Sequence, residues 1–263
     1  MKLSIVIPAL NEEKTIAQVI VCVQESIAAS SFAQSDVELL VIDADSTDNT
    51  YHEAAATGAC VLNWREIIPH IPPRTGKGES LWRGVYAARG EIVMFIDADL
   101  ETVDPMIVSK LTAPFSNPQI HLVKADYRRA FQGQPTGGGR VTQLSAKPLL
   151  RAFFPELASI NQPLAGEYAI RRSTALSLAF VEGYGVEIGL LIDIYRRYGI
   201  TAIAQAQLVD KYHRNRTLTE LSAMSDIVIA TILDRVGIVN ELGINQRMPI
   251  DAISSQANLG EGK

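Results

Sequence analysis

A chain of 263 residues is long enough for one large domain, and 47% apolar with only 20% charged residues predicts a well-filled core and excludes disorder. A net charge of -5 argues against a general nucleic-acid binder. The apolar runs fall far short of the roughly 18 residues that span a bilayer, and Met1 to Pro8 is too short and strand-like for a signal peptide. Two cysteines make no disulfide framework. We therefore expect a soluble cytoplasmic protein.

Strands alternate with single helices over about the first 100 residues. Short apolar runs predict strands at 3–7, 37–42, 60–62 and 91–97. Helices are predicted after Asn11 and after Ser46, each taken as a cap, and at 79–88. Such alternation predicts βαβ units and a largely parallel sheet, which is the α/β class.

The pattern loosens after Asp104. We predict strands at 120–124 and 201–208, and helices at 144–153, interrupted by Pro148, and at 186–198, closed by Gly199. Thr217 to Glu220 is a capping box before a long apolar helix through Ile238. That helix carries more apolar surface than a solvent-facing helix needs. It is either buried in the core or a subunit interface, and we favour the interface of a homodimer.

Three predicted strands end in polar or acidic residues. These ends are Pro8 to Glu12, Asp43-Ala44-Asp45, and Asp97-Ala98-Asp99. Helix capping and turns would explain either acidic pair alone. Ligands of open α/β sheets bind at the carboxyl ends of the strands, so three such ends together favour a binding site. Carboxylates there suit Mg²⁺ or Mn²⁺, and such a metal would hold a diphosphate.

Several basic or glycine-rich segments are further candidates for anion binding. Gly76-Lys77-Gly78-Glu79 is not a Walker loop, because Ile71 stands where the first glycine belongs, but Lys77 can reach a phosphate as a point charge. Gly137 to Thr142 offers backbone N–H groups, a guanidinium and a hydroxyl, which is either a phosphate or carboxylate nest or a merely flexible loop. His213, within the basic run 211–216, is either a third metal ligand or an exposed turn histidine. Local basic clusters in an acidic protein suit a small anionic ligand.

At these residues the chain closely resembles the glucosyl-3-phosphoglycerate synthases, retaining glycosyltransferases of family GT81 with the GT-A fold. The matching segments span about residues 3 to 225 and read I-P-A-L-N-E-E (7–13), G-K-G-E-S-L-W-R (76–83), F-I-D-A-D-L (95–100), Y-R-R (127–129), G-G-G-R-V-T (137–142), Q-P-L-A-G-E-Y (162–168), G-Y-G-V-E-I-G-L-L-I-D (183–193) and H-R-N-R (213–216). The resemblance implies one GT-A domain, with a Rossmann-like nucleotide-sugar-binding half at 1–119, a smaller acceptor-binding half at 120–250 and a flexible tail at 251–263.

The resemblance also implies a reaction. Glucose would pass from UDP-glucose to the 2-hydroxyl of D-3-phosphoglycerate, giving glucosyl-3-phosphoglycerate, a precursor of the compatible solute glucosylglycerate. The site residues that it implies are Pro8, Ala9, Leu10, Asn11, Glu12, Asp45, Lys77, Asp97, Ala98 and Asp99 for the donor; Gly139, Arg140, Val141, Thr142, Lys211, Asn215 and Arg216 for the acceptor; Asp99 and His213 for the metal; and Asp99 and Glu187 for catalysis.

Other functions remain open at this point. The donor could be GDP-glucose or GDP-mannose, and the acceptor could be glycerate. A sugar nucleotidyltransferase shares the α/β sheet and the metal carboxylates, but Pro8 to Glu12 lacks the glycine- and arginine-containing loop typical of that class. A non-catalytic nucleotide-sugar sensor would tolerate loss of Asp99 or His213, and both residues are present.

Overall fold

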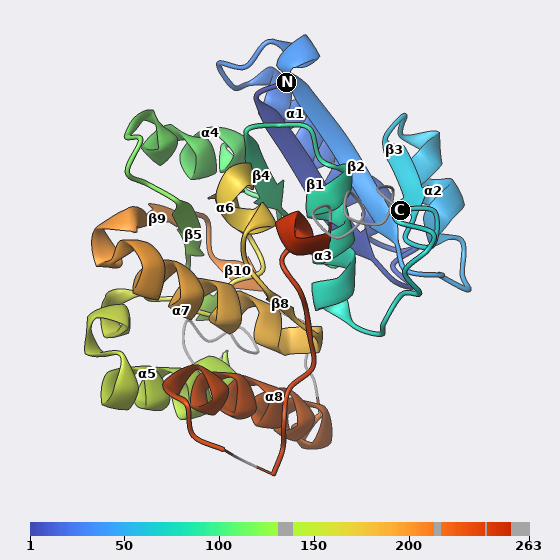
Figure 1. The fold of residues 1–263 in the computed structure, drawn as a ribbon. Helices are drawn as coiled ribbons and strands as arrows, with labels where there is room; N and C mark the ends of the chain where they lie inside the picture. Colours follow the sequence, from blue (N-terminus) through green and yellow to red (C-terminus); the bar gives the residue numbers. More distant parts are fainter. Residues whose placement is uncertain (131–138, 213–216, 240, 254–263) are drawn as a thin grey trace, which may run out of the picture.

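A large mixed sheet runs through the middle of the molecule (Figure 1). The computed structural model describes residues 1–130, 139–212, 217–239 and 241–253, with only the backbone given for 129, 130, 211 and 212. Within these ranges the sheet has seven strands. In spatial order they are β3 (Cys60–Asn63), β2 (Val37–Asp43), β1 (Leu3–Ala9), β4 (Ile92–Phe95), β7 (Tyr168–Arg171), β5 (Leu122–Asp126) and β9 (Ile203–Gln207).

The strand directions confirm the prediction of a mainly parallel sheet. Strands β3, β2, β1 and β4 all run parallel, and β5 runs parallel to β9. The exception is β7, which lies antiparallel between β4 and β5. Its position joins the two halves of the predicted domain in one continuous sheet. Two small sheets complete the structure: β6 (Arg129–Ala130) pairs with β10 (Lys211–Tyr212), and β8 (Phe180–Val181) pairs with β11 (Gln246–Arg247).

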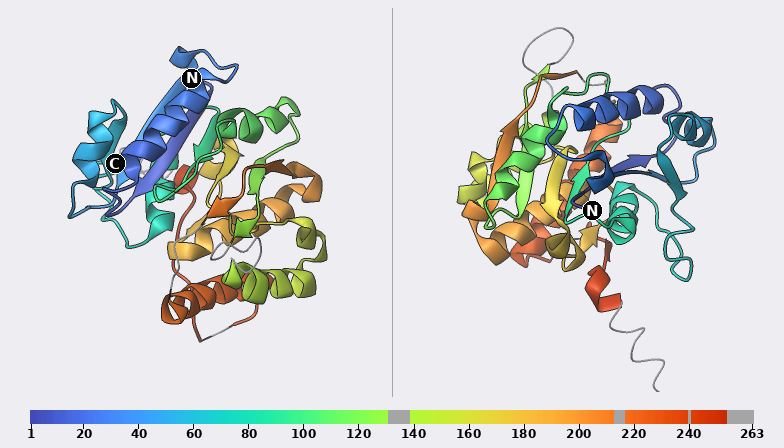
Figure 2. Two further views of the ribbon diagram at one scale, coloured as in Figure 1. Left: turned by 180° about the vertical axis from the view of Figure 1, so that it is seen from behind. Right: turned by 90° about the horizontal axis from the view of Figure 1, so that it is seen from above.

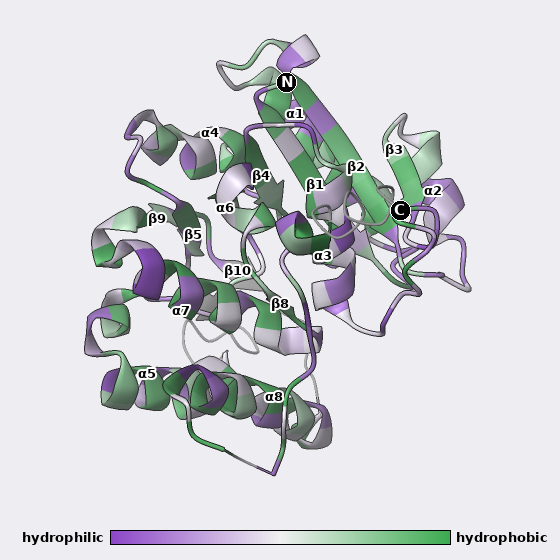
Figure 3. Ribbon diagram, viewed as in Figure 1, coloured by the Kyte–Doolittle hydropathy of each residue, from purple (hydrophilic) through white to green (hydrophobic). Residues whose placement is uncertain are grey.

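Helices cover both faces of the large sheet, as the two views in Figure 2 show. On one face lie α1 (Ile16–Ala28), α2 (Thr50–Ala56) and α4 (Ile107–Thr112), and on the other lie α3 (Lys77–Ala87), α6 (Arg172–Leu176) and α7 (Val186–Tyr198). Side chains alternate along β1, so Leu3, Ile5 and Ile7 pack on the α1 face while Val6 packs on the α3 face. Hydrophobic residues accordingly run along β2 and β3 in Figure 3.

A further helical layer lies beyond α7. It is formed by α5 (Lys147–Phe153) and α8 (Leu218–Val236), which contact each other, and α8 also packs against α7. The capping box of α8 is confirmed: the Thr217 hydroxyl accepts from the Glu220 N–H, and the Glu220 carboxylate accepts from the Thr217 N–H at 2.7 Å.

The remaining short helices are η1 (Gln34–Asp36), η2 (Ala113–Ser116), the π-helix η3 (Thr142–Ala146), η4 (Pro155–Ser159), η5 (Gly183–Gly185) and η6 (Ile200–Ala202).

Two predicted helix caps are wrong. Helix α1 begins after Thr15, four residues beyond Asn11, and α2 begins after Asn49, three residues beyond Ser46. Asn11 and Ser46 bond each other's loops instead, because the loops that follow β1 and β2 leave the same edge of the sheet. Pro148 does not interrupt a helix either: the helical segment that starts at Arg140 runs through the π-helix at 142–146 and continues into α5 across Pro148.

The helix through 186–198 and its closure by Gly199 are confirmed to the residue, and Gly199 has a positive φ of 79°. Of the tail at 251–263, only residues 251–253 are described, and residues 250–253 form one helical turn. Among the described residues, no helix combines the length and the apolar character needed to cross a membrane.

Candidate active site

The loops after β1 and β2 are bonded together at the carboxyl edge of the sheet. Ala44 donates its N–H to the Ala9 carbonyl at 2.9 Å, and Asn11 accepts from the Thr47 N–H at 2.8 Å through its side-chain oxygen. Asn11 has a positive φ of 57°, which Asn tolerates better than most residues. The predicted convergence of these strand ends is therefore confirmed, and Pro8 to Glu12 lines one side of the edge.

The second acidic pair lies at the same edge and is held by neighbouring side chains. Asp45 accepts from Arg65 Nε at 2.7 Å and from Asn63 Nδ2 at 3.1 Å. The hydrogen bond from Arg65 is the main cause that lowers the pKa of Asp45 below its ordinary value. Asp43 is only 3% exposed, and within the described part of the chain its Oδ1 has no hydrogen-bond partner.

Lys77 forms the centre of the site. It stands at the first position of α3, and its Nζ lies 2.6 Å from Asp97 Oδ1 and 2.7 Å from Glu187 Oε1. Burial lowers the pKa of Lys77, but the charges and hydrogen bonds of Asp97 and Glu187 outweigh it and raise the pKa well above its ordinary value. The ammonium group is therefore charged at any physiological pH. Three residues far apart in the sequence, all predicted for the site, thus meet around one positive charge.

Gly166 closes the site against Asp97. A Cβ at this position would lie 2.3 Å from Asp97 Oδ2, well inside contact distance, so any side chain would displace the carboxylate. Gly166 belongs to the segment Q-P-L-A-G-E-Y, which leads from η4 into β7. The backbone of this segment therefore borders the site. A glycine is required at position 166 because the Asp97 carboxylate lies so close to it, and not because of its φ angle.

Lys124 holds the backbone of this segment at Ala165. No motif in the sequence marks this role, because Lys124 stands only at the end of a predicted strand. Its side chain is 1% exposed, donates to the Ala165 carbonyl at 2.6 Å and lies 4.5 Å from the centre of the Tyr168 ring. Burial is the main cause that lowers its pKa to about 7, opposed by the charge of Glu187. A lysine within an apolar strand that faces the ligand edge is the signal that could have found it.

The lowered pKa of Lys124 predicts a pH dependence of stability. Between pH 7 and 10.5 the unfolded chain keeps a proton that folded Lys124 has lost, so the free energy of unfolding rises with pH, by up to about 1.4 kcal/mol per pH unit for this one group. Lys124→Met removes this contribution. Urea unfolding at pH 7, 8 and 9 should show the wild type gaining stability relative to the variant as the pH rises. A constant difference between the two proteins would contradict the lowered pKa.

The predicted metal ligands are described only in part. Asp99 lies exposed in the loop after β4, two residues beyond Asp97, and His213 lies outside the described residues. Within the described residues no three His, Cys, Asp or Glu side chains form a cluster that could hold a metal ion. The carboxylate oxygens of Asp99 are hard donors that fit Mg²⁺ or Mn²⁺ at the edge where a diphosphate would lie.

The predicted acceptor residues begin a helix. Gly139 has a positive φ of 71°, and a continuous helical segment starts at Arg140. N–H groups of a first helical turn lack partners within the helix, so this start is a suitable place for an anion. Val141 and Thr142 are buried there. Only the backbone of Lys211 is described, and Asn215 and Arg216 lie outside the described residues.

Arg171, the first of two consecutive arginines, does not belong to the site. Because β7 is antiparallel, Arg171 lies beside Ile92, at the start of β4 and the far edge of the sheet. Its guanidinium donates to the carbonyls of Ile120 and Asn117, and therefore has a structural role.

Comparison with known proteins agrees with this geometry. The family model "Glycosyl transferase family 2" matches residues 4–165. Glucosyl-3-phosphoglycerate synthase of Mycobacterium tuberculosis (strain CDC 1551 / Oshkosh) is 49% identical over 256 residues, which cover 94% of this chain and 78% of that protein. The protein of the same name from Petrotoga mobilis (strain DSM 10674 / SJ95) is 42% identical, covering 94% and 77%. The chain belongs to the glucosyl-3-phosphoglycerate synthase family.

Solved structures of this family have the same fold. A crystal structure of the M. tuberculosis synthase matches with a TM-score of 0.86 and 44% identity, covering 96% of this chain and 92% of that one. The complex of the M. tuberculosis synthase with Mn²⁺, UDP-glucose and phosphoglyceric acid matches with a TM-score of 0.85, covering 96% and 91%. The predicted family resemblance and the α/β fold class of GT-A type are thus confirmed.

Proposed function

We propose that the chain transfers glucose from UDP-glucose to the 2-hydroxyl of D-3-phosphoglycerate with retention of configuration, giving glucosyl-3-phosphoglycerate, and that it requires Mg²⁺ or Mn²⁺. The observation that carries this proposal is the meeting of Lys77, Asp97 and Glu187 at the ligand edge of a synthase-family fold. The M. tuberculosis relative has been solved with Mn²⁺, UDP-glucose and phosphoglyceric acid, and also with UDP and glucosyl-3-phosphoglycerate, which supports the same substrates here.

The proposed donor site follows the sheet edge from β2 to β4. The loops after β1 and β2 hold the uridine, through Pro8, Ala9, Leu10, Asn11, Glu12 and Asp45. Lys77 faces the diphosphate, while Asp97 and Ala98 border the ribose or sugar. Asp99 and His213 hold the metal, which when bound acts as a Lewis acid on the leaving diphosphate. The fixed charge of Lys77 adds electrostatic stabilisation without reorganisation during the reaction.

The proposed acceptor site faces the donor from the second half of the chain. Its residues are Gly139, Arg140, Val141, Thr142, Lys211, Asn215 and Arg216. The helix start at Arg140 supports this placement, because it offers backbone N–H groups and a guanidinium to a phosphate or carboxylate. Holding the acceptor hydroxyl beside the sugar carbon supplies a large part of the rate acceleration.

Glu187 is proposed to orient the reacting sugar, with attack on the same face from which UDP departs. Its side chain is 5% exposed, and its Oε1 is already engaged by Lys77 at 2.7 Å. A carboxylate paired with an ammonium group is a weaker nucleophile than an unpaired one in the same site. This pairing supports front-face attack over a covalent glucosyl-Glu187 intermediate.

One assay distinguishes the transferase from the other classes. The protein is incubated with Mg²⁺ and UDP-glucose, with and without 3-phosphoglycerate, and UDP release is measured. Release that depends on 3-phosphoglycerate, with an α-anomeric product in the NMR spectrum, supports the proposal. Turnover that requires pyrophosphate would indicate a nucleotidyltransferase, and binding without turnover a sensor. GDP-glucose, GDP-mannose and glycerate, each tested at the same concentration, would establish the alternative donors and acceptor.

We also propose a cytoplasmic homodimer in which 1–119 and 120–250 act as donor and acceptor halves of one domain and 251–263 is a flexible tail. Cys22 and Cys60 are both free, which suits a reducing compartment. Helix α8 buries Val228 and Ile232, but Leu218 at its start is 76% exposed, as is Leu144 in the neighbouring η3. Sedimentation of the wild type and of Leu218→Ser measures the association; a wild-type monomer would contradict the dimer.

A further inference from the structure

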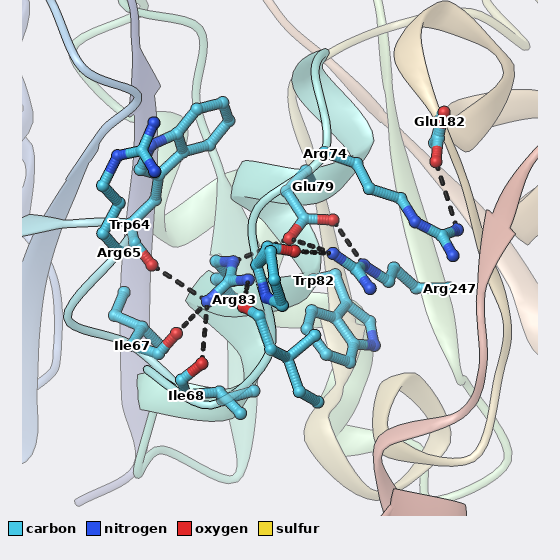
Figure 4. Close-up of polar contacts among 12 residues, drawn as sticks. Trp64, Arg65, Ile67, Ile68, Arg74, Glu79, Trp82, Arg83, Glu182 and Arg247 are labelled. Carbon is cyan, nitrogen blue, oxygen red and sulfur yellow. Dashed lines mark hydrogen bonds and ion pairs between the residues drawn. The ribbon is translucent and has the colours of Figure 1, made fainter.

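A buried cluster of one acid and two arginines is centred on Glu79, two residues after Lys77 in the sequence (Figure 4). Glu79 is 0% exposed and accepts from Arg83 Nε at 2.7 Å and from Arg247 Nε at 2.6 Å. Arg247 Nη2 also donates to Glu79 Oε1 at 2.9 Å, so the Arg247 guanidinium forms a bidentate hydrogen bond with the carboxylate. A two-pronged bond of this kind fixes both the distance and the plane of the carboxylate.

The same arginines hold the segment between β3 and α3. Arg83 donates to the carbonyls of Trp64, Ile67 and Ile71, and Arg247 donates to the Pro72 carbonyl at 2.6 Å. This segment has no regular secondary structure that would satisfy its own backbone. The two guanidinium groups therefore fix the path along which the chain enters α3.

Arg247 reaches this cluster from the far end of the chain. Figure 1 shows the C-terminal segment, in red, returning from α8 toward α3. There β11 pairs with β8, with Arg247 opposite Phe180, and Asn245 accepts from the Glu182 N–H at 2.9 Å. Met248 accepts from the Trp82 indole at 3.0 Å. Residues 245–248, which we term the C-terminal clasp, thus bind both α3 and β8.

The start of α3 has no room to move between its neighbours. A Cβ on Gly78 would lie 2.0 Å from the Val181 carbonyl oxygen, and a Cβ on Gly76 would lie 2.9 Å from the Gly183 backbone. Lys77 stands between these glycines, two residues before Glu79. The turn that carries Lys77 is therefore pressed against the β8 side, and Glu79 in its first turn is held by Arg247.

We propose that Arg247 is a positioning residue for the donor site: through Glu79 and β8 it fixes the first turn of α3, and so places Lys77 between Asp97 and Glu187. The inference rests on the proposed role of Lys77 toward the donor diphosphate. It gives the C-terminal clasp a part in catalysis, although none of its residues is among the predicted donor or acceptor residues. The effect of Arg247 should be confined to the donor side. In the described part of the chain its side-chain hydrogen bonds go to Glu79 and Pro72, and none goes to a predicted acceptor residue.

The kinetic split between the two substrates tests this inference. Arg247→Met leaves Glu79 with one arginine and so keeps a neutral buried pair. We expect kcat/KM for UDP-glucose to fall about 10-fold or more, since a displacement near 1 Å can cost up to about 10²-fold, while the KM for 3-phosphoglycerate stays within about twofold. Arg247→Lys keeps the positive charge but cannot bind Glu79 through two nitrogens, so it should recover part of the lost kcat/KM. The matched control is Arg171→Met, which removes a guanidinium bonded to carbonyls at the opposite edge of the sheet.

A double-mutant cycle separates positioning from general destabilisation. In a Lys77→Met background, Arg247→Met should lower kcat/KM for UDP-glucose by less than about twofold, because the group that it positions is already gone. The same fold-loss in both backgrounds, or an equal loss in Arg171→Met at matched thermal stability, overturns the inference. If the wild type does not transfer glucose, the proposed function fails. If it does and Arg247→Met matches it, only the inference about Arg247 fails.

Discussion

Asp99→Ala is expected to lower kcat by about 10³-fold or more while the protein stays folded. Asp99 is exposed in the loop after β4, so its replacement by alanine leaves no cavity in the core. Its carboxylate is proposed to bind the metal together with His213. A metal that neutralises a leaving diphosphate is worth several kcal/mol in the transition state, and about 4 kcal/mol corresponds to about 10³ in rate.

Binding as well as turnover should be measured for this variant. Titration of Mn²⁺ in the presence of UDP, followed by the electron paramagnetic resonance of the free ion, should show strongly weakened binding. The matched control is Glu101→Ala, an exposed acid two residues further along the same loop, which should bind Mn²⁺ and turn over as the wild type does. Metal-dependent activity retained in Asp99→Ala would refute the assignment of Asp99 as a ligand.

Lys77→Met is expected to lower kcat/KM for UDP-glucose by about 10²- to 10³-fold, the range seen when one fixed donor to a developing charge is removed. The substitution removes the positive charge that lies between Asp97 and Glu187 and leaves two carboxylates facing each other. Breaking a largely buried ion pair by removing one partner costs about 3 kcal/mol of stability. Activity should therefore fall well beyond what the loss of folded protein explains.

Two measurements separate these effects. Calorimetric titration with UDP reports whether the donor still binds, and thermal unfolding reports stability. Lys2→Met is the control, because Lys2 also forms an ion pair, with Asp36 at 3.2 Å, but lies at the start of β1, away from the ligand edge. An unchanged affinity for UDP together with an unchanged kcat in Lys77→Met would show that this lysine does not face the diphosphate.

Local patterns predicted most of the elements, and the misses have a common cause. The helix at 186–198 and the capping box at Thr217 depend on residues a few positions apart, so the sequence contains all the information. Asn11 and Ser46 are equally good caps by local rules. Neither residue caps a helix, because each binds the loop of the other, 35 residues away, and no local pattern reveals such a contact.

The candidate site divides in the same way. Local patterns marked Lys77, which lies between two glycines, and Asp97, which lies at a strand end, whereas Glu187 was implied only by the family resemblance. Their meeting at 2.6 and 2.7 Å depends on how α3, β4 and α7 pack. Lys124 and Arg247 carry no motif at all. Their importance comes from burial and from partners 41 and 168 residues away.

The sequence by itself determined the α/β class, the parallel half of the sheet and the strand ends that face the ligand, because periodicity and strand-end chemistry are properties of neighbouring residues. Only the tertiary structure decided that β7 runs antiparallel, that Arg171 faces away from the site, and that the C-terminal clasp reaches the turn that carries Lys77. Those outcomes depend on which distant segments share a buried interface. Charged groups in such an interface must find partners wherever the fold brings them, because burying them unpaired is too costly.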